Sequence, residues 1–289
     1  NFLYLGYREL KRLEARLFER LAELSRREDA AQGRFGFVTA RQFFGMDINP
    51  FACELAKVTM MIARKLAIDE LHVHEHALPL DNLDANFIPG DALIDAAGQP
   101  TQWPRADVII GNPPFLGSRY LAKEHGYEYA RKIHAAHPTV PRMADYCVYW
   151  LRCAHDYLPV CTPADPFGGR AGLVGTQNIR NNQSRVGGLD HIVKTGTIVE
   201  AVDNQPWSGE ANVHVSIVNW VKTSSLPPPP GEGPGEGPAK PVDPADLLIP
   251  ASKKLWSKVQ PVQGVKRPRR RGDALASKEC ELAVRECDT

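Results

Sequence analysis

The chain has 289 residues, of which 43% are hydrophobic, so it is long enough to bury a sizeable core. Its formal net charge is +1, so overall charge does not indicate a nucleic-acid partner, and any such contact would need a local patch. Six cysteines without a Cys-x-x-Cys pair or regular spacing favour reduced thiols in a cytoplasmic protein over disulfides or zinc. The sequence contains no apolar run long enough to span a membrane and no visible signal peptide.

Two helices and a strand are predicted in the first part of the chain. Leucines recur at three- and four-residue spacing across 2–28 with Arg and Glu between them, which predicts an amphipathic helix. The segment 41–47 predicts a buried strand that ends on Asp47, and Pro50 is placed to begin a second amphipathic helix over 51–67. The apolar stripes of these helices are Leu3, Leu10, Leu13, Leu17, Leu21 and Leu24, and then Phe51, Leu55, Val58, Ile62 and Leu66.

Acidic residues end two of the predicted strands. Asp47 ends the first, and Asp91 lies near the end of a strand predicted within 83–93. A carboxylate between a strand tip and a helix is the usual position for holding ribose hydroxyls. Each residue also has a plainer interpretation, which is the more common one for a single aspartate. Asp47 would satisfy free N–H groups of the following helix, and Asp91 would stabilise a turn.

Three alternating histidines, His72, His74 and His76, point the same way if their segment is extended. A metal site is one interpretation. No carboxylate or cysteine cluster accompanies them, so a solvated strand edge or loop is favoured. We therefore assign no metal and leave these histidines out of the predicted site.

One short stretch is the centre of the functional prediction. The β-branched run 108–110 predicts a strand buried on both faces, and it stops at the Gly-Asn-Pro-Pro of 111–114 because prolines cannot continue a ladder. The result is a stiff corner at the carboxyl edge of a sheet, where ligands bind in α/β folds. Asn112 Oδ1 and the Pro113 carbonyl can accept both N–H bonds of a planar amino group, and Phe115 can stack on the group that carries it. The alternative is a strand that simply ends in a proline turn.

The remaining elements predict an α/β fold with a doubly wound, mostly parallel sheet that ends in an antiparallel hairpin, because parallel strands need helical crossovers. This order places Asp47, Asp91 and the corner on one sheet edge. Residues 116–142 predict a mobile loop, or a loop with short helical pieces. The other predicted elements are a helix over 143–158, a strand over 170–176, a short helix over 185–194, and paired strands over 197–202 and 213–221. Beyond them, 223–246 is a Pro/Gly-rich linker and 247–289 a short, largely disordered basic tail.

Several stretches together resemble the catalytic domain of S-adenosylmethionine-dependent DNA adenine-N6 methyltransferases. The likeness is strongest to the single-chain (type II, combined) restriction–modification enzymes. The stretches occur in the family order and place a catalytic domain at residues 1–222 with a Rossmann-like, class I methyltransferase fold. They are Asn1-Phe2-Leu3, Gly45 to Pro50, Asp81 to Asp84 with Gly90-Asp91, Gly111 to Phe115, Ala144 to Tyr146, and Trp207 to Ala211.

The resemblance implies a role for each strand-tip residue in binding S-adenosyl-L-methionine. Asp47 would hold the ribose hydroxyls of the cofactor, and Ile48 would pack on its adenine. Asp91 would accept a hydrogen bond from the adenine amino group, with Ala92 beside it.

The resemblance also implies the catalytic role of the corner formed by Asn112, Pro113, Pro114 and Phe115. Asn112 and Pro113 would accept from the exocyclic amino group of a target adenine. Phe115 would stack on that base after it swings out of the duplex. Two fixed acceptors stabilise the positive charge that develops on the nitrogen during methyl transfer.

Asn1-Phe2-Leu3 resembles only the tail of the cofactor motif Asp-Pro-x-Cys-Gly-x-Gly-Asn-Phe-Leu, so Asn1 and Phe2 would lie at the cofactor. The glycine loop and the strand before it are absent from the sequence, which begins with Asn. We therefore expect an N-terminally truncated fragment that binds S-adenosylmethionine weakly or not at all, whereas its parent binds it.

The expected partner is double-stranded DNA, with recognition and nuclease domains elsewhere in the parent chain and no membrane partner. Two alternatives stay open. One is an amino-methyltransferase acting on protein glutamine or ribosomal RNA, since such enzymes carry the same corner. The other is an inactive truncated remnant that at most binds DNA.

Overall fold

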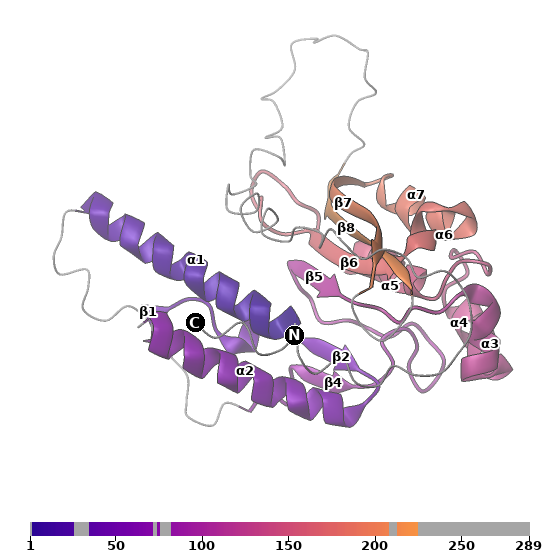
Figure 1. The fold of residues 1–289 in the computed structure, drawn as a ribbon, viewed down its shortest axis with the longest axis horizontal. Coiled ribbons are helices and arrows are strands. Elements are labelled where there is room, and N and C mark those ends of the chain that lie inside the picture. The colour runs from indigo at the N-terminus through magenta and orange to yellow at the C-terminus, as the bar shows by residue number, and fades with distance from the viewer. Residues whose placement is uncertain (1, 26–34, 72–73, 76–81, 208–212, 225–289) are drawn as a thin grey trace, which may run out of the picture. The chain divides into compact units, whose positions relative to one another are not determined.

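The computed structural model describes residues 2–25, 35–71, 74–75, 82–207 and 213–224, which form a mixed α/β structure (Figure 1). The predicted linker 223–246 lies outside the described residues after 224, and the predicted tail 247–289 lies wholly outside them. The last described strand ends at Lys222, and the domain boundary predicted there stays a prediction. Within the described residues, no helix is long and apolar enough to cross a membrane.

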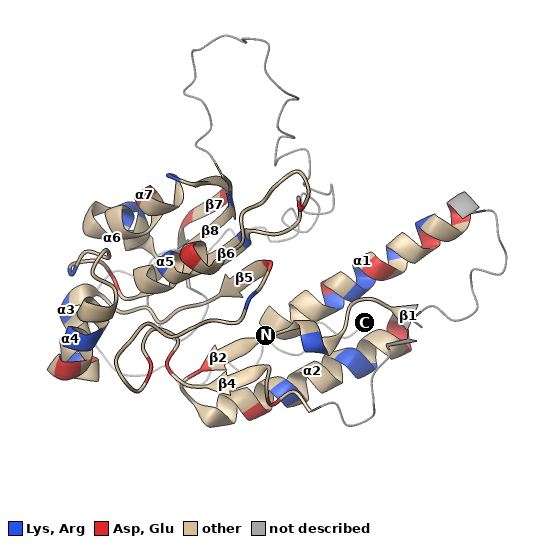
Figure 2. Ribbon diagram, turned by 180° about the vertical axis from the view of Figure 1, so that it is seen from behind, with Lys and Arg blue, Asp and Glu red and all other residues tan. Residues whose placement is uncertain are grey.

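Two long helices begin the chain. Helix α1 (Phe2–Ser25) and helix α2 (Pro50–Leu71) confirm the two predicted helices, and they lie side by side in both ribbon views. Lys and Arg alternate with Asp and Glu along both helices, so neither presents a face of one charge (Figure 2). Arg8 and Arg12 of α1 both pair with Glu70 of α2, and the Arg12 Nη2–Glu70 Oε1 distance is 3.2 Å.

The buried sides of these helices differ from the predicted stripes. On α1 the buried residues are Tyr7, Lys11 and Glu14, and on α2 the buried set includes Met60 and Ala63. The two helices share a small apolar cluster that includes Tyr7 and Met60, and much of their remaining apolar surface faces outward. The exposed members of the predicted stripes are Leu10, Leu13, Leu17 and Leu21 of α1, and Phe51, Leu55, Val58, Ile62 and Leu66 of α2.

A buried ion pair fixes α1 to the chain that follows. Lys11 Nζ lies 3.0 Å from Glu14 Oε2, and both side chains are buried. Glu14 Oε1 accepts hydrogen bonds from the backbone N–H groups of Phe37 and Val38, the latter at 2.9 Å. These residues directly follow β1 (Phe35–Gly36), which pairs in parallel with β3 (His74–Glu75). Of the three alternating histidines, 72 and 76 lie outside the described residues.

Strand β2 (Gly45–Asp47) follows a short 3-10 helix, η2 (Ala40–Gln42), and pairs in parallel with β4 (Phe87–Pro89). Both strands are shorter than the sequence predicts. Phe87 is buried among residues of α1 and α2, so this strand pair and the two helices share one apolar cluster.

A four-stranded sheet forms the second half of the fold, in the order β5-β6-β8-β7. Its strands are β5 (Val108–Gly111), β6 (Arg170–Thr176), β7 (Gly196–Pro206) and β8 (His214–Lys222). The β5–β6 pair is parallel, and the pairings of β8 with β6 and β7 are antiparallel. The predicted strands over 170–176, 197–202 and 213–221 and their terminal hairpin are therefore confirmed.

The strands of the described residues form three separate sheets, two of two strands and one of four. Within that part of the chain, β2 pairs only with β4 and β5 pairs only with β6. The prediction that β5 is buried on both faces is wrong. Ile109 packs on the core, but the side chains of Val108 and Ile110 are 53% and 46% exposed, because β5 is an edge strand covered on one side.

Helices cover the larger core. The segment 116–142, expected to be mostly loop, contains α3 (Ser118–His125) and α4 (Tyr127–Ala136), which bury Leu121 and Ile133. Gly126, at φ +91°, separates the two helices, and each is too short to show a repeating stripe in the sequence. The predicted helix over 143–158 is confirmed as α5. The remaining elements are α5 (Cys147–Tyr157), η3 (Gln177–Arg180), α6 (Asn182–Gly187) and α7 (Leu189–Ile192).

Candidate active site

The Asn-Pro-Pro-Phe corner directly follows β5 at the edge where β6 also ends. Gly111 pairs with Leu173, and β6 runs on to Thr176, so both parallel strands deliver their carboxyl ends here. Pro113 is buried and holds the corner, whereas Asn112 is exposed. The Asn112 side chain has no hydrogen-bond partner in the part of the chain that the structure describes, so its amide is free to bind a ligand.

Phe115 lies against an aromatic residue from the terminal hairpin. Its ring is 5.3 Å from that of Trp207, at an interplanar angle of 82°, which is an edge-to-face contact. Trp207 directly follows β7, and its N–H donates to the Val213 carbonyl at 2.9 Å. The hairpin therefore brings Trp207 beside the corner. Residues 208–212 lie outside the described residues, and they include all of the Trp207–Ala211 stretch except Trp207.

Asp47 ends β2, and Asp91 lies two residues beyond the end of β4, the parallel strand paired with β2. Asp47 pairs with Pro89, and its carbonyl accepts from Gly90 N at 2.8 Å, so Asp91 lies one residue beyond this bond. Asp47 Oδ1 accepts from Asn49 N at 2.8 Å, which is the local turn bond of the plainer interpretation. Its other oxygen has no partner among the described residues. Next to it, the Ile48 side chain is 73% exposed.

Both oxygens of the Asp91 carboxylate are engaged. Oδ1 accepts from Leu93 N at 2.8 Å, and Oδ2 accepts from the Tyr129 hydroxyl at 2.6 Å. The first bond is again a turn bond, and the second reaches an element far along the chain. The carbonyl of Ala92 accepts from Trp103 Nε1 at 2.6 Å, which fixes the backbone next to Asp91.

Two tyrosines connect Asp91 to the corner. The Tyr129 and Tyr146 hydroxyls are 2.6 Å apart, and Tyr146 N donates to the Leu116 carbonyl at 2.8 Å, directly after Phe115. Burial, together with the hydrogen bond to Asp91, raises the pKa of Tyr129. Burial raises the pKa of Tyr146 to about 12. Both hydroxyls therefore keep their protons near neutral pH and remain available as donors.

Tyr129 was not predicted as part of the site, because it lies in the helical segment 116–142, which has little periodicity. Tyr146 belongs to a stretch that carried the family resemblance, but its connection to Asp91 was not predicted. A tyrosine paired with a carboxylate thirty-eight positions away leaves no pattern in one sequence.

The first two residues are not joined to these acids. Asn1 lies outside the described residues, and Phe2 begins α1 with its side chain 46% exposed. No hydrogen bond or ring contact in the described part of the chain connects Phe2 to Asp47 or Asp91. In the same part of the chain, no group of three or more His, Cys, Asp or Glu residues has the arrangement of a metal site.

A family model described as "MmeI, DNA-methyltransferase domain" matches residues 1–226. The protein "DNA methyltransferase A" of Bacillus subtilis (strain 168) is 33% identical over 134 residues, which are 43% of this chain and 14% of that protein. The chain thus spans a small part of the length of this relative. Among solved structures, a modification subunit assigned to a type I restriction enzyme from Vibrio vulnificus YJ016 is 16% identical, with a TM-score of 0.41. That alignment covers 77% of this chain and 43% of the other.

Proposed function

Because the chain belongs to the family of the MmeI DNA-methyltransferase domain, we propose that it transfers a methyl group from S-adenosylmethionine to the N6 amino group of an adenine in double-stranded DNA. We place this activity in a restriction–modification system. The observation that carries the proposal is the exposed Asn112 amide, which has no hydrogen-bond partner among the described residues, on a corner held by the buried Pro113.

The corner supplies acceptors rather than a base. The lone pair of an adenine amino group is delocalised into the ring, so this nitrogen is a poor nucleophile. Asn112 Oδ1 and the Pro113 carbonyl would accept its two N–H bonds and stabilise the positive charge that develops during attack. Pro113 and Pro114 fix the backbone, so these acceptors need little reorganisation. After methyl transfer the extra proton on the nitrogen would pass to solvent water, and the proposal assigns no general base to the corner.

The aromatic pair provides a surface for the base. Phe115 would stack on an adenine swung out of the duplex, and Trp207 lies close enough to border the same space. Unstacking the target base costs a few kcal/mol, which stacking on aromatic rings offsets.

The residues around β2 and β4 fit the ribose and adenine of the cofactor. Asp47 has one oxygen without a partner among the described residues, beside the exposed side chain of Ile48. Asp91 keeps acceptor capacity, because a carboxylate has about four lone-pair positions and two are used. When bound, S-adenosylmethionine supplies an electrophilic methyl group on sulfur; these residues and Ala92 would orient it.

In the described residues, β2 and β5 each leave one edge without a partner. We propose that the separate sheets belong to one doubly wound sheet of the Rossmann-like kind.

The test is transfer of a labelled methyl group into adenine-containing duplex DNA by the intact protein that carries this chain. We expect Asn112→Ala to lower transfer by about a hundredfold or more, since a positioned acceptor is worth that much. Cofactor affinity, measured by calorimetry, stays within about twofold. Gln102→Ala, which truncates an exposed amide elsewhere, leaves both unchanged.

Other outcomes identify the alternatives. Label that appears in protein or RNA but not in DNA would contradict the choice of substrate. Equal loss of methyl transfer and cofactor affinity in Asn112→Ala would contradict the role given to this residue. Micromolar binding of S-adenosylmethionine by residues 1–289 alone would contradict the expectation that the chain needs its glycine loop.

A further inference from the structure

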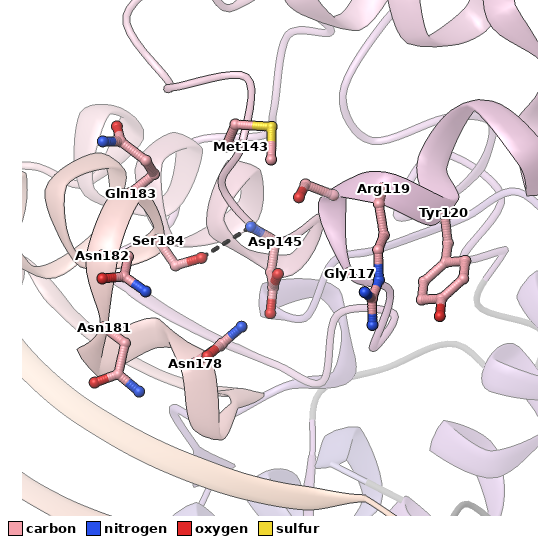
Figure 3. A pocket seen from close by; sticks show the side chains of 11 residues that line it. Gly117, Arg119, Tyr120, Met143, Asp145, Asn178, Asn181, Asn182, Gln183 and Ser184 are labelled. Carbon is pink, nitrogen blue, oxygen red and sulfur yellow. Dashed lines mark hydrogen bonds between the residues drawn. The ribbon is translucent and has the colours of Figure 1, made fainter.

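A polar cavity begins immediately after the corner. It has a volume of about 610 Å³, within the range of small-molecule sites. One wall is the start of α3 with the residues before it, and the other is the turn from η3 into α6 (Figure 3). Gly117, on the first wall, is only two residues beyond Phe115. The cavity therefore lies at the same sheet edge as the candidate site, although none of its lining residues was assigned to that site.

Asp145 lines the cavity and is only 6% exposed. The Thr176 hydroxyl donates to its Oδ2 at 2.7 Å, and Asp145 N donates to the Ser184 hydroxyl at 2.9 Å. Its Oδ1 has no hydrogen-bond partner in the described part of the chain and lies next to Gly117, where an added Cβ would be 3.9 Å away. Among the described residues, Asp145 Oδ1 is not one of the fully buried polar atoms without a partner, so it is reached from the cavity and can accept from a donor placed there.

The opposite wall consists of amides. Four exposed side chains line it, and none makes a hydrogen bond within the described residues; they are Asn178, Asn181, Asn182 and Gln183. An amide presents a donor and an acceptor side by side, which matches the edge of a nucleobase. Figure 3 shows the Asp145 carboxylate between this wall and Arg119.

Two further features suit a nucleotide. The Arg119 guanidinium lies 4.9 Å from the centre of the Tyr120 ring. This contact keeps the positive charge of Arg119 beside the cavity. Met143, 68% exposed, gives the rim a flexible apolar surface. The negative charge of Asp145 repels a phosphate, so a base enters the depth of the cavity and the phosphate stays near Arg119.

We infer that this cavity binds a DNA nucleotide flanking the target adenine, with an exocyclic amino group of its base donating to Asp145 Oδ1. The inference rests on the proposed function, because it takes DNA as the substrate. Adenine, cytosine and guanine carry such an amino group, and thymine does not. The cavity thus favours amino-bearing bases at one position beside the target.

The experiment measures binding of the 289-residue chain to twelve-nucleotide single strands of dC, dA or dT by fluorescence anisotropy. We expect dC and dA strands to bind at least five- to tenfold more tightly than dT. Asp145→Asn keeps an acceptor for Thr176 but turns an amino group toward the cavity, so it should abolish or reverse this preference. A purely structural role of Asp145 would weaken all three strands equally.

A second variant keeps the inference testable if Asp145→Asn does not fold. Gln183→Ala truncates an exposed wall residue and should weaken dC and dA binding by about threefold or more, with dT unchanged. The control is Gln99→Ala, an exposed amide outside the cavity, which should change nothing. If all three strands bind with equal affinity and these variants do not change it, the inference about the cavity is wrong, and the proposed function is unaffected. Failure to bind any strand also overturns the inference, whereas the proposed function is tested separately by methyl transfer into duplex DNA.

Discussion

The two halves of the described structure reach stability differently. The carboxy-terminal region, with β5 to β8 and α3 to α7, buries a large apolar cluster that includes Tyr149, Leu151 and Trp220. The amino-terminal region, with α1, α2 and β1 to β4, buries a small cluster rich in alanine, together with the Lys11–Glu14 pair. It also leaves most of its leucines outside. The amino-terminal region therefore depends on a few polar contacts where the other depends on packing.

This contrast bears on the candidate site, because the two regions contribute different parts of it. Asp47 belongs to the small cluster's strands, and the corner with Asn112 belongs to the large sheet. Asp91 is tied to the large cluster through Tyr129. The segment after β4 is thus a bridge, and its hydrogen bonds connect the residues predicted to hold the cofactor with the predicted catalytic corner.

The largest expected effect is the loss of Glu14. Glu14→Ala removes the partner of a buried lysine and the acceptor for two backbone N–H groups, so it should lower the free energy of unfolding by about 3–5 kcal/mol. Urea titration followed by circular dichroism measures this. Glu9→Ala, which breaks an exposed pair on the same helix, should cost less than about 1 kcal/mol. Similar losses in the two variants would mean that the buried pair is not what holds α1.

A matched pair of core truncations compares the regions directly. Leu151→Ala and Met60→Ala each remove a fully buried side chain, from α5 and α2 respectively. We expect the free energy of unfolding to fall by about 4 kcal/mol in Leu151→Ala, because its dense surroundings cannot close the cavity. In Met60→Ala we expect a fall of about 2 kcal/mol. The urea midpoint of each variant measures the difference. Equal costs would show that the small core is packed as tightly as the large one.

In the carboxy-terminal region the sequence predicted α5, β6 and the β7–β8 hairpin, but it gave mainly loop where α3 and α4 lie and did not predict the exposed face of β5. Cys147, Leu151 and Ala154 of α5 face the core, as their three- and four-residue spacing predicts, whereas Met143 lies before the helix and is exposed. In α1 and α2 the helices were correct and the buried faces were not. An amphipathic pattern shows which side of a helix avoids water, but a partner surface decides whether that side is covered. Within the described residues, no such partner covers Leu13 or Leu17.

The candidate site residues could be predicted from the sequence where they lie at or just after the ends of strands. Asp47, Asp91 and Asn112 come at strand ends, and the register of β2 with β4 brings the two acids together. The tyrosine connection and the buried Asp145 were not predictable, because they join residues from different elements without any local spacing. The roles given to these residues stay predictions.

A smaller expected effect is a pH dependence of stability that is specific to the carboxy-terminal region. Burial, with His191 and Lys222 nearby, lowers the pKa of His155 to about 4 from an ordinary value near 6.5. As the pH falls, His155 takes up a proton more readily in the unfolded chain than in the folded one. The stabilising contribution of the buried, neutral His155 is therefore full above pH 6.5 and is lost between pH 6.5 and 4. We expect a loss of about 2 kcal/mol in this window for the transition of the carboxy-terminal region. His155→Phe should flatten the decline, and His214→Gln, at an exposed position, should not. An unchanged pH profile in His155→Phe would assign the decline to other groups.

The smallest expected effect concerns the exposed leucines. Leu13→Glu and Leu17→Glu replace side chains that are 42% and 53% exposed, and glutamate forms helices about as well as leucine. Their free energies of unfolding should change by less than about 0.5 kcal/mol, measured by urea titration at low protein concentration. Light scattering at high concentration should fall, because an exposed apolar face promotes association. Tyr7→Glu, on the buried face of the same helix, should instead unfold the amino-terminal region. A large loss of unfolding free energy in Leu13→Glu would show that another surface covers this face in solution. The few apolar contacts of the amino-terminal region would then reflect a partner surface outside it and not its own sequence.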